Sequence, residues 1–270
     1  MLSQAQIEEF ENNGFLKGGI VLSDAEVEAL RDELDLVMNG QSVKKPVLSH
    51  NMLAKGYDDM KMTVSESVVQ IVNIWMASDV YFQHTANKTI CEEIAQLTRT
   101  DEVRIWHDQI QYKPPVTGGP TKWHQDHPLW PIITPSDLVS AWVALDDATI
   151  ENGCMWMVPG SHKWGNHQQY LESNAEFKPV HKQPELLPEG ADTAPVPFEI
   201  KKGQVGYHHC LTWHGSPNNR SQHKRRAIAV HYMPGHTRYA PTAGHPMLPF
   251  VSVEPGELLT GDHFPLVYQR

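Results

Sequence analysis

The chain has 270 residues, of which 40% are hydrophobic, and this length and composition are typical of one large globular domain. Its formal net charge of −10 argues against a nucleic-acid backbone as partner, because binding one requires a basic face. No window approaches the roughly 18 consecutive apolar residues of a membrane helix, and the N-terminus is polar and acidic. We therefore expect a small-molecule substrate, with neither membrane nor nucleic acid as partner.

The cysteines indicate a protein without structural disulfides or a zinc–thiolate site. They are odd in number, widely spaced and without a Cys-x-x-Cys pair: Cys91, Cys154 and Cys210. This pattern argues against a disulfide framework and against a thiolate zinc site. A reducing, cytoplasmic location is expected.

The first hundred residues are predicted to be mostly helical. Ser3 and Ser23 each stand three residues before a Gln or Glu and just ahead of apolar residues at helical spacing, which is the capping-box pattern. The second of these helices is expected to end near Gly40, with a short strand at 14–21 between the two. Helical periodicity recurs further on, at residues 64–78 and 87–98.

The sequence pattern changes near residue 103. Short apolar or alternating runs follow, each cut by Pro or Gly, at 103–112, 138–145, 154–158, 196–200, 204–208 and 226–233. Evenly punctuated strands of this kind are typical of an antiparallel sandwich or jelly roll. We predict a single domain over 1–270, with a helical flank at 1–100 and a β core at 103–235. The stretch 165–195 is predicted to be a long loop between strands.

One pair of residues has the spacing of metal ligands. His124 and Asp126 are two apart, so on an extended strand both side chains leave the same face. With 16 histidines in the chain, such a pair is expected about once by chance, so alone it carries no weight.

A second cluster supports the interpretation of His124 and Asp126 as metal ligands. His214 is followed eleven residues later by Arg225, at the start of an apolar strand. Two histidines and one carboxylate form the facial triad of Fe(II) oxygenases, which leaves coordination positions open for a 2-oxo acid and dioxygen. The far carboxylate of a diacid needs a bidentate cation, which Arg supplies better than Lys, and Ser216 could add a hydroxyl.

These motifs together resemble the phytanoyl-CoA hydroxylase (phytanoyl-CoA dioxygenase) family of 2-oxoglutarate dioxygenases, which includes ectoine hydroxylase. The resemblance covers most of the chain and rests on the helical start with Gly14-Phe15, on Tyr112-Lys113-Pro114-Pro115, Trp123-His124-Gln125-Asp126, Ser136 to Trp142, Glu151 to His162, and His214-Gly215-Ser216 with Arg225. It implies a double-stranded β-helix, a cupin-like jelly roll, with N-terminal helices along one sheet.

The resemblance also implies the cofactors and site residues. Iron would be bound by His124, Asp126 and His214, and 2-oxoglutarate by Arg225, with the neighbouring Arg226 as the lesser alternative. The tryptophan that the family places beside the co-substrate corresponds to Trp142. Dioxygen is the oxidant, and ascorbate would support the reaction in vitro.

Several polar or aromatic residues have weaker claims. His107 and Gln111 alternate on one face of a predicted strand, which is normally exposed to solvent, but the corresponding family strand lines the interior and helps to hold 2-oxoglutarate. Trp123, His127 and Trp130 flank the metal motif and would equally well serve packing. Five further histidines are interpreted as structural or surface residues: His162, His167, His208, His209 and His231. The stretch from Glu151 to His162 is interpreted as scaffold because its Asn-Gly and Pro-Gly pairs are turn-forming.

The expected reaction is hydroxylation of an unactivated C–H bond, with release of succinate and CO2. Family members that halogenate lack the carboxylate, whereas Asp126 is present here, which favours hydroxylation or desaturation. Two rivals remain. One is a jelly-roll hydrolase or isomerase that uses the same ligands on another metal and has no need of Arg225; the other is a non-catalytic ligand-binding relative.

Overall fold

The computed structural model describes residues 1–44, 48–51, 68–173 and 187–270. The α-helices are α1 Gln4–Asn13, α2 Asp24–Met38, α3 Asp79–Thr85, α4 Lys88–Thr98 and α5 Gln168–Ser173. Short 3-10 helices are η1 Ile74–Met76, η2 His127–Leu129, η3 Ser161–Trp164 and η5 Leu248–Phe250. The strands are β1 Phe15–Ile20, β2 Leu48–Asn51, β3 Val69–Val72, β4 Glu102–Lys113, β5 Thr121–His124, β6 Ile133–Thr134, β7 Val139–Ala144, β8 Met155–Met157, β9 Val196–Phe198, β10 Gln204–His209, β11 His214–Ser216, β12 Arg225–Pro234, β13 Arg238–Tyr239 and β14 Leu266–Gln269.

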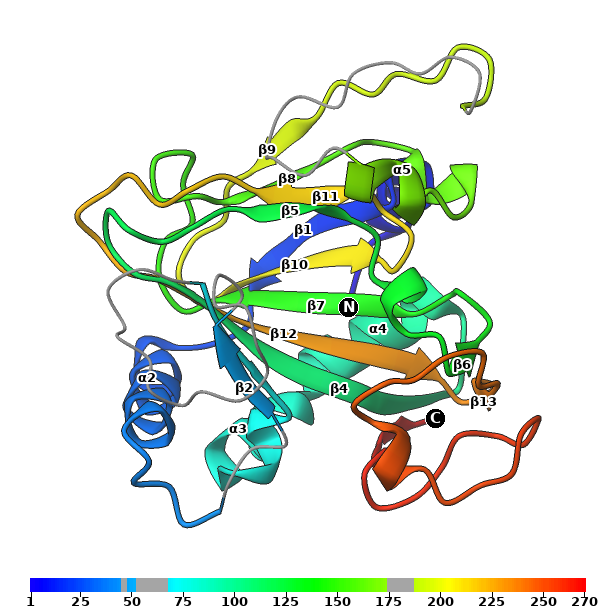
Figure 1. Cartoon of the computed structure of the whole chain (residues 1–270), viewed down its shortest axis with the longest axis horizontal. Helices are drawn as coiled ribbons and strands as arrows, with labels where there is room; N and C mark the ends of the chain where they lie inside the picture. The colour runs from blue at the N-terminus through cyan, green and yellow to red at the C-terminus, as the bar shows by residue number, and fades with distance from the viewer. Residues whose placement is uncertain (45–47, 52–67, 174–186) are drawn as a thin grey trace.

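The strands form two main antiparallel sheets. The larger has eight strands in the order β1-β10-β7-β12-β4-β3-β2, with β14 paired to β4, and the smaller has the order β5-β11-β8-β9. The smaller sheet lies above the larger one in Figure 1, and β6 and β13 form a separate ribbon. A mainly β fold with N-terminal helices is thus confirmed. Within the described ranges, no helix combines the length and apolarity needed to cross a bilayer.

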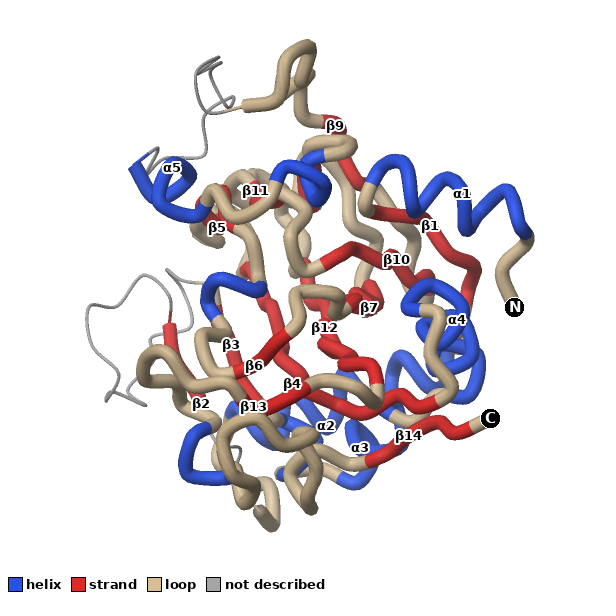
Figure 2. The backbone as a smooth tube through the Cα atoms, turned by 90° about the vertical axis from the view of Figure 1, so that its right-hand side faces the viewer, coloured by secondary structure: helices blue, strands red, loops and turns tan. Residues whose placement is uncertain are grey.

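Helices cover one face of the eight-stranded sheet. In Figures 1 and 2, α2, α3 and α4 lie along the side of this sheet that faces away from β5 and β11. Side chains from this face, such as Val143, Ile228 and Val230, share one apolar cluster with Leu30 of α2 and Ile94 of α4. Because strand side chains alternate, the intervening residues of the same strands point toward the four-stranded sheet.

A bulge in β4 changes which residues point to which side. Tyr232 of β12 pairs with Ile105, but the preceding His231 pairs with His107, so Trp106 is an extra residue. Before the bulge Ile105 belongs to the helix-side cluster, and after it Ile110 does. His107 and the residues at i+2 and i+4 therefore face the smaller sheet.

The predicted capping boxes are confirmed. The Ser3 and Ser23 side chains each accept a hydrogen bond from the backbone N–H three residues later, and Gln6 and Glu26 reach back to the cap residues. The helix at 87–98 and the strand at 14–21 are also confirmed, as α4 and β1.

One element assignment was wrong. The helical pattern at 64–78 is instead strand β3, from Val69 to Val72, followed by the short η1 and then α3. Asn73 adopts a left-handed conformation (φ 55°) that ends the strand, and β3 is held by backbone pairing with β4, a long-range contact that local periodicity does not report. Residues 64–67 lie outside the described part of the chain.

Candidate metal and co-substrate site

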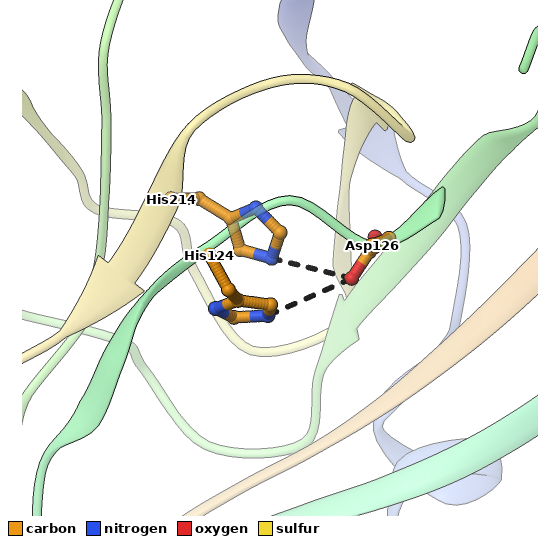
Figure 3. A group of neighbouring side chains, drawn as sticks. All are labelled: His124, Asp126 and His214. Atoms are coloured by element: carbon orange, nitrogen blue, oxygen red, sulfur yellow. Dashed lines mark ion pairs between the residues drawn. The ribbon is translucent and has the colours of Figure 1, made fainter. Parts of the chain in front are cut away.

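The three predicted metal ligands meet at the edge of the four-stranded sheet. His124 ends β5 and His214 begins β11, where the two residues are directly paired. The expectation that Asp126 lies on the same strand as His124 was wrong. The strand ends at His124, and Asp126 adopts a helical conformation (φ −70°, ψ −52°) before η2. This turn brings its carboxylate to face both imidazoles (Figure 3).

The ligand atoms lie at metal-binding separations. One potential ligand atom from each of His124, Asp126 and His214 lies within 4.8 Å of the others, and both Nε2 atoms are 3.6 Å from Oδ1 of Asp126. Nδ1 of His124 is 2.8 Å from the Lys122 carbonyl, and Nδ1 of His214 is 2.9 Å from the Thr212 carbonyl. Each Nδ1–H therefore donates to a carbonyl, which leaves the Nε2 lone pair directed at the common point.

Other strands hold the second oxygen of Asp126. His208 Nε2 lies 3.0 Å from Oδ2, and Ser140 Oγ donates to the same oxygen at 3.3 Å. His231 Nδ1 is in turn 2.6 Å from Ser140 Oγ. His208 and His231 were expected to be structural or surface residues; both are buried beside the cluster. Ser140 was recognised only as part of a family motif, and none of these contacts has a local sequence signal, because each residue comes from a different strand.

At Asp126 and His214 the electrostatics favour the protonation states that bind metal, whereas at His124 burial is outweighed by the hydrogen bond and charge of Asp126, which raise its pKa. Burial alone would raise the pKa of Asp126, but the neighbouring His214, His124 and His208 hold it well below its ordinary value. Burial, together with the proximity of His124, lowers the pKa of His214 well below its ordinary value. A deprotonated carboxylate and a neutral imidazole are the forms in which these residues coordinate a metal ion.

The two arginines at the start of β12 point to opposite sides of the sheet. Arg226 makes two hydrogen bonds of 2.9 Å from Nε and Nη2 to the two oxygens of Asp146, on the helix side. Arg225 is 1% exposed, and its Nε and Nη1 have no hydrogen-bond partner among the described residues. Its guanidinium carbon lies 5.5 Å from the ring centre of Trp142, the tryptophan predicted to lie near the co-substrate.

A second buried cation lies opposite Arg225. Lys113 pairs with Arg225 across β4 and β12, and burial, with the charge of Arg225, lowers the pKa of Lys113 well below its ordinary value. Its Nζ donates to the carbonyls of Ser216, at 3.3 Å, and Pro217, at 2.5 Å. The sequence signal for Lys113 was its place in the Tyr112-Lys113-Pro114-Pro115 motif. Ser216 itself is buried two residues beyond His214.

A cavity of about 570 Å³ opens onto the metal cluster. It is lined by Gln70, His107, Gln109, Gln111, Pro120, Thr121, Lys122, Trp123, His124, Asp126, Leu129, Trp130, Gln168, Glu172 and His231. His107 and Gln111 thus line a pocket, as do Trp123 and Trp130. His127 is not among the lining residues, and its Nε2 contacts the Ile133 carbonyl at 3.2 Å.

Arg225 lies behind this cavity wall. It is not one of the cavity-lining residues, and neither is Trp142, whose Nε1 donates to Gln111 Oε1 at 3.1 Å. The residues nevertheless fit the predicted cofactors. The donor set of two imidazoles and one carboxylate suits Fe(II), and unpaired guanidinium donors inside the protein suit a carboxylate.

Comparison with known proteins points to one family. Residues 10–227 match the family model of Phytanoyl-CoA dioxygenase (PhyH). The peroxisomal phytanoyl-CoA dioxygenase of Rattus norvegicus is 28% identical over 253 residues, covering 90% of this chain and 72% of the rat protein.

Solved structures agree. The non-haem α-ketoglutarate-dependent carbocyclase SnoK from nogalamycin biosynthesis is 25% identical with a TM-score of 0.77, covering 98% of this chain and 96% of that one. EctD from S. alaskensis, solved with 2-oxoglutarate and 5-hydroxyectoine, is 23% identical with a TM-score of 0.65, covering 88% of this chain and 78% of that one.

Proposed function

Because the chain belongs to the phytanoyl-CoA dioxygenase family, whose members are 2-oxoglutarate-dependent non-haem iron dioxygenases, we propose that it hydroxylates an unactivated C–H bond of a small organic metabolite. His124, Asp126 and His214 would hold Fe(II), and Arg225 would bind the far carboxylate of 2-oxoglutarate. The iron supplies the oxidation chemistry: one oxygen atom of O2 enters succinate as CO2 leaves, and the other enters the substrate.

The observation that carries this proposal is the buried guanidinium of Arg225, whose Nε and Nη1 have no hydrogen-bond partner among the described residues. A buried charge without a partner is costly, so its presence beside Trp142 would be explained by an anionic ligand that binds there. Trp142 contacts both this guanidinium and Gln111, so Gln111 would lie at the boundary between co-substrate and cavity. A hydrolase or isomerase using the same three ligands would have no use for Arg225.

The protein's own residues would orient the reactants. The carbonyls of Lys122 and Thr212 fix the two imidazole rings, and the hydrogen bonds to Oδ2 of Asp126 hold its other oxygen toward the cluster. Such partners commonly change metal affinity or activity by about 10- to 100-fold. His107 would line the end of the cavity where the substrate lies.

The proposal includes finer points of fold and location. We infer that the two sheets are the layers of a double-stranded β-helix, in one domain spanning 1–270. The N-terminal flank at 1–100 and the core at 103–235 would form one unit, since β1 and β14 both join the core sheet. A cytoplasmic location, a small-molecule substrate and support by ascorbate remain predictions.

The test is succinate formation from 2-oxoglutarate with Fe(II) and ascorbate, followed across a panel of metabolites. We expect succinate to accumulate, and the productive metabolite to accelerate it. Both rivals, the hydrolase or isomerase and the non-catalytic relative, predict none.

The outcome for the organic substrate is tested by mass spectrometry under ¹⁸O2 with excess chloride. Asp126 would occupy the position that halogenating relatives leave for chloride, so we expect one labelled oxygen in the product. A chlorinated product would contradict the role of Asp126, and a loss of two hydrogens would indicate a desaturase.

A further inference from the structure

The cavity is lined by a histidine whose second nitrogen has no hydrogen-bond partner in the described part of the chain. His231 is 2% exposed and lines the cavity, and its Nε2 makes no hydrogen bond among the described residues. Its ring lies 4.6 Å from that of His107 and 4.8 Å from that of Trp130, measured between ring centres. The ring is thus held in place, and its Nε2 is buried without a hydrogen-bond partner among the described residues.

The hydrogen bonds behind His231 define its tautomer. The Oδ2 atom of Asp126 can only accept, so Ser140 Oγ, which has a single hydrogen, donates that hydrogen to the carboxylate. The 2.6 Å contact between Ser140 Oγ and His231 Nδ1 is then a hydrogen bond only if Nδ1 carries the proton. A neutral imidazole protonated on Nδ1 has its lone pair on Nε2, so Nε2 of His231 is a hydrogen-bond acceptor.

The neighbouring wall of the cavity is neutral and polar. Gln70, Gln109 and Gln111 line it from β3 and β4, and Gln70 Nε2 donates to Gln109 Oε1 at 2.5 Å. Lys122 is the one Lys or Arg among the described lining residues, and Glu172 lines the same cavity. A strongly anionic substrate would therefore find one exposed lysine and an opposing carboxylate.

From these contacts we propose that Nε2 of His231 accepts a hydrogen bond from a hydroxyl or N–H group of the organic substrate, and that the substrate is an uncharged molecule bearing such a donor. This inference rests on the proposed function, because it concerns the substrate of that site. The chain from Asp126 through Ser140 to His231 would link the metal cluster to the substrate donor, so the donor group would lie near the carbon that reacts. His231 is here a specificity-determining residue.

The first test reads the tautomer directly on the wild-type chain. Full-length protein labelled with ¹⁵N-histidine and loaded with diamagnetic Zn(II) is measured by ¹⁵N NMR, and the His231 signals are identified by their loss in His231→Asn. We expect Nδ1 to carry the proton and Nε2 to show the shift of an unprotonated nitrogen. A protonated Nε2 would overturn the proposal.

The second test measures donor preference with a matched pair of probes, cyclohexanol and methoxycyclohexane. In the Zn(II)- and 2-oxoglutarate-loaded protein we expect the alcohol to bind about five- to tenfold more tightly than the ether, the worth of one hydrogen bond. The amide of His231→Asn can still donate to Ser140 but cannot reach the position of Nε2, so the preference should disappear. Equal binding of alcohol and ether by the wild type contradicts the proposal.

Two controls separate this inference from the proposed function. The exposed His223 makes no side-chain contact with the cavity, so His223→Gln should keep the preference for the alcohol. The charge-transfer absorption of the anaerobic Fe(II)–2-oxoglutarate complex needs no organic substrate. If the wild type lacks this absorption, the proposed function fails. If His231→Asn keeps the absorption but no longer prefers the alcohol over the ether, the role of His231 is supported.

Discussion

The two faces of the eight-stranded sheet are built from alternate residues of the same strands, yet their chemistry is opposite. On the helix side Val143, Ile228 and Val230 form an apolar core with α2 and α4. On the inner side the same strands present Arg225 and His231, both buried. One face supplies hydrophobic stabilisation, and the other holds polar groups that cost stability unless they are paired.

This contrast teaches how the fold carries a reactive site. A rigid core on one face fixes the strands, so that the imidazoles and the guanidinium on the other face are held in place, and His208 and Ser140 of that face contact the carboxylate of Asp126 at the four-stranded sheet. Substitutions on the inner face are therefore expected to change ligand binding and turnover, and those on the helix side to change stability.

The largest effect is expected from the metal ligands. His124→Ala, Asp126→Ala or His214→Ala each removes one of three ligands, so succinate formation should fall more than about a hundredfold, beyond the effect of an outer partner. Iron binding should weaken in parallel, and His223→Gln should retain both. Near-normal turnover in any of the three alanine variants would refute the assignment.

The helix side should respond in stability instead. Ile228 is fully buried against the helices, and Ile228→Ala should lower the free energy of unfolding by about 2–5 kcal/mol. Urea denaturation measures this, with Ile228→Val as the milder comparison at about 0.5–1.5 kcal/mol. The folded fraction should keep its 2-oxoglutarate affinity; a marked loss would show that the two faces are not separable.

The neighbouring arginines test the comparison within one strand. Arg225→Lys removes the bidentate fork, so the 2-oxoglutarate concentration needed for half-maximal succinate formation should rise about 10- to 100-fold, while iron still binds. Arg226→Lys should leave it unchanged. If Arg226→Lys raised the 2-oxoglutarate requirement and Arg225→Lys did not, Arg226 and not Arg225 would lie on the inward face of β12.

The smallest effect concerns the ion pair on the helix side. Arg226→Lys should cost about 1 kcal/mol of unfolding free energy at neutral pH, because one of two hydrogen bonds to Asp146 is lost. Burial alone would raise the pKa of Asp146, but Arg226 holds it below its ordinary value. The ion pair therefore contributes fully above the unfolded pKa of about 3.9, and its contribution disappears as pH falls through the lower folded value. Below pH about 3.9, the difference in unfolding free energy between Arg226→Lys and wild type should become smaller. A difference that stays constant with pH would show that it does not come from the ion pair with Asp146.

Much of the architecture could be predicted from local patterns. Capping residues marked the first two helices, and the punctuated runs marked β4, β7, β8, β9, β10 and β12, but not β5 and β11, which carry the two histidines. Residues 69–76 were misassigned because β3 depends on pairing with distant residues of β4, Val69 with Tyr112 and Val72 with Gln109. Local periodicity cannot report such a contact.

The site was predictable in part. Family motifs and spacing brought forward the three candidate ligands and favoured Arg225 over Arg226, but only the fold shows that Arg226 instead pairs with Asp146 on the helix side of β12. Ser140, His208 and His231 converge from three strands, and only the tertiary register places them around Asp126.

The extra residue Trp106 has a consequence for how such a protein can change. Upstream of it, odd-numbered residues of β4 such as Ile105 meet the helices; downstream, even-numbered ones such as Ile110 do. Deleting Trp106 would remove the bulge and leave the pocket lining in place, because Ile105 would still pair with Tyr232 and His107 with His231. Deleting a residue of the regular ladder beyond the bulge, such as Asp108, would instead turn Gln111 to the helix side, because every later residue of β4 would move one place along β12. The bulge is therefore the place where β4 can lose one residue without changing which side chains line the pocket.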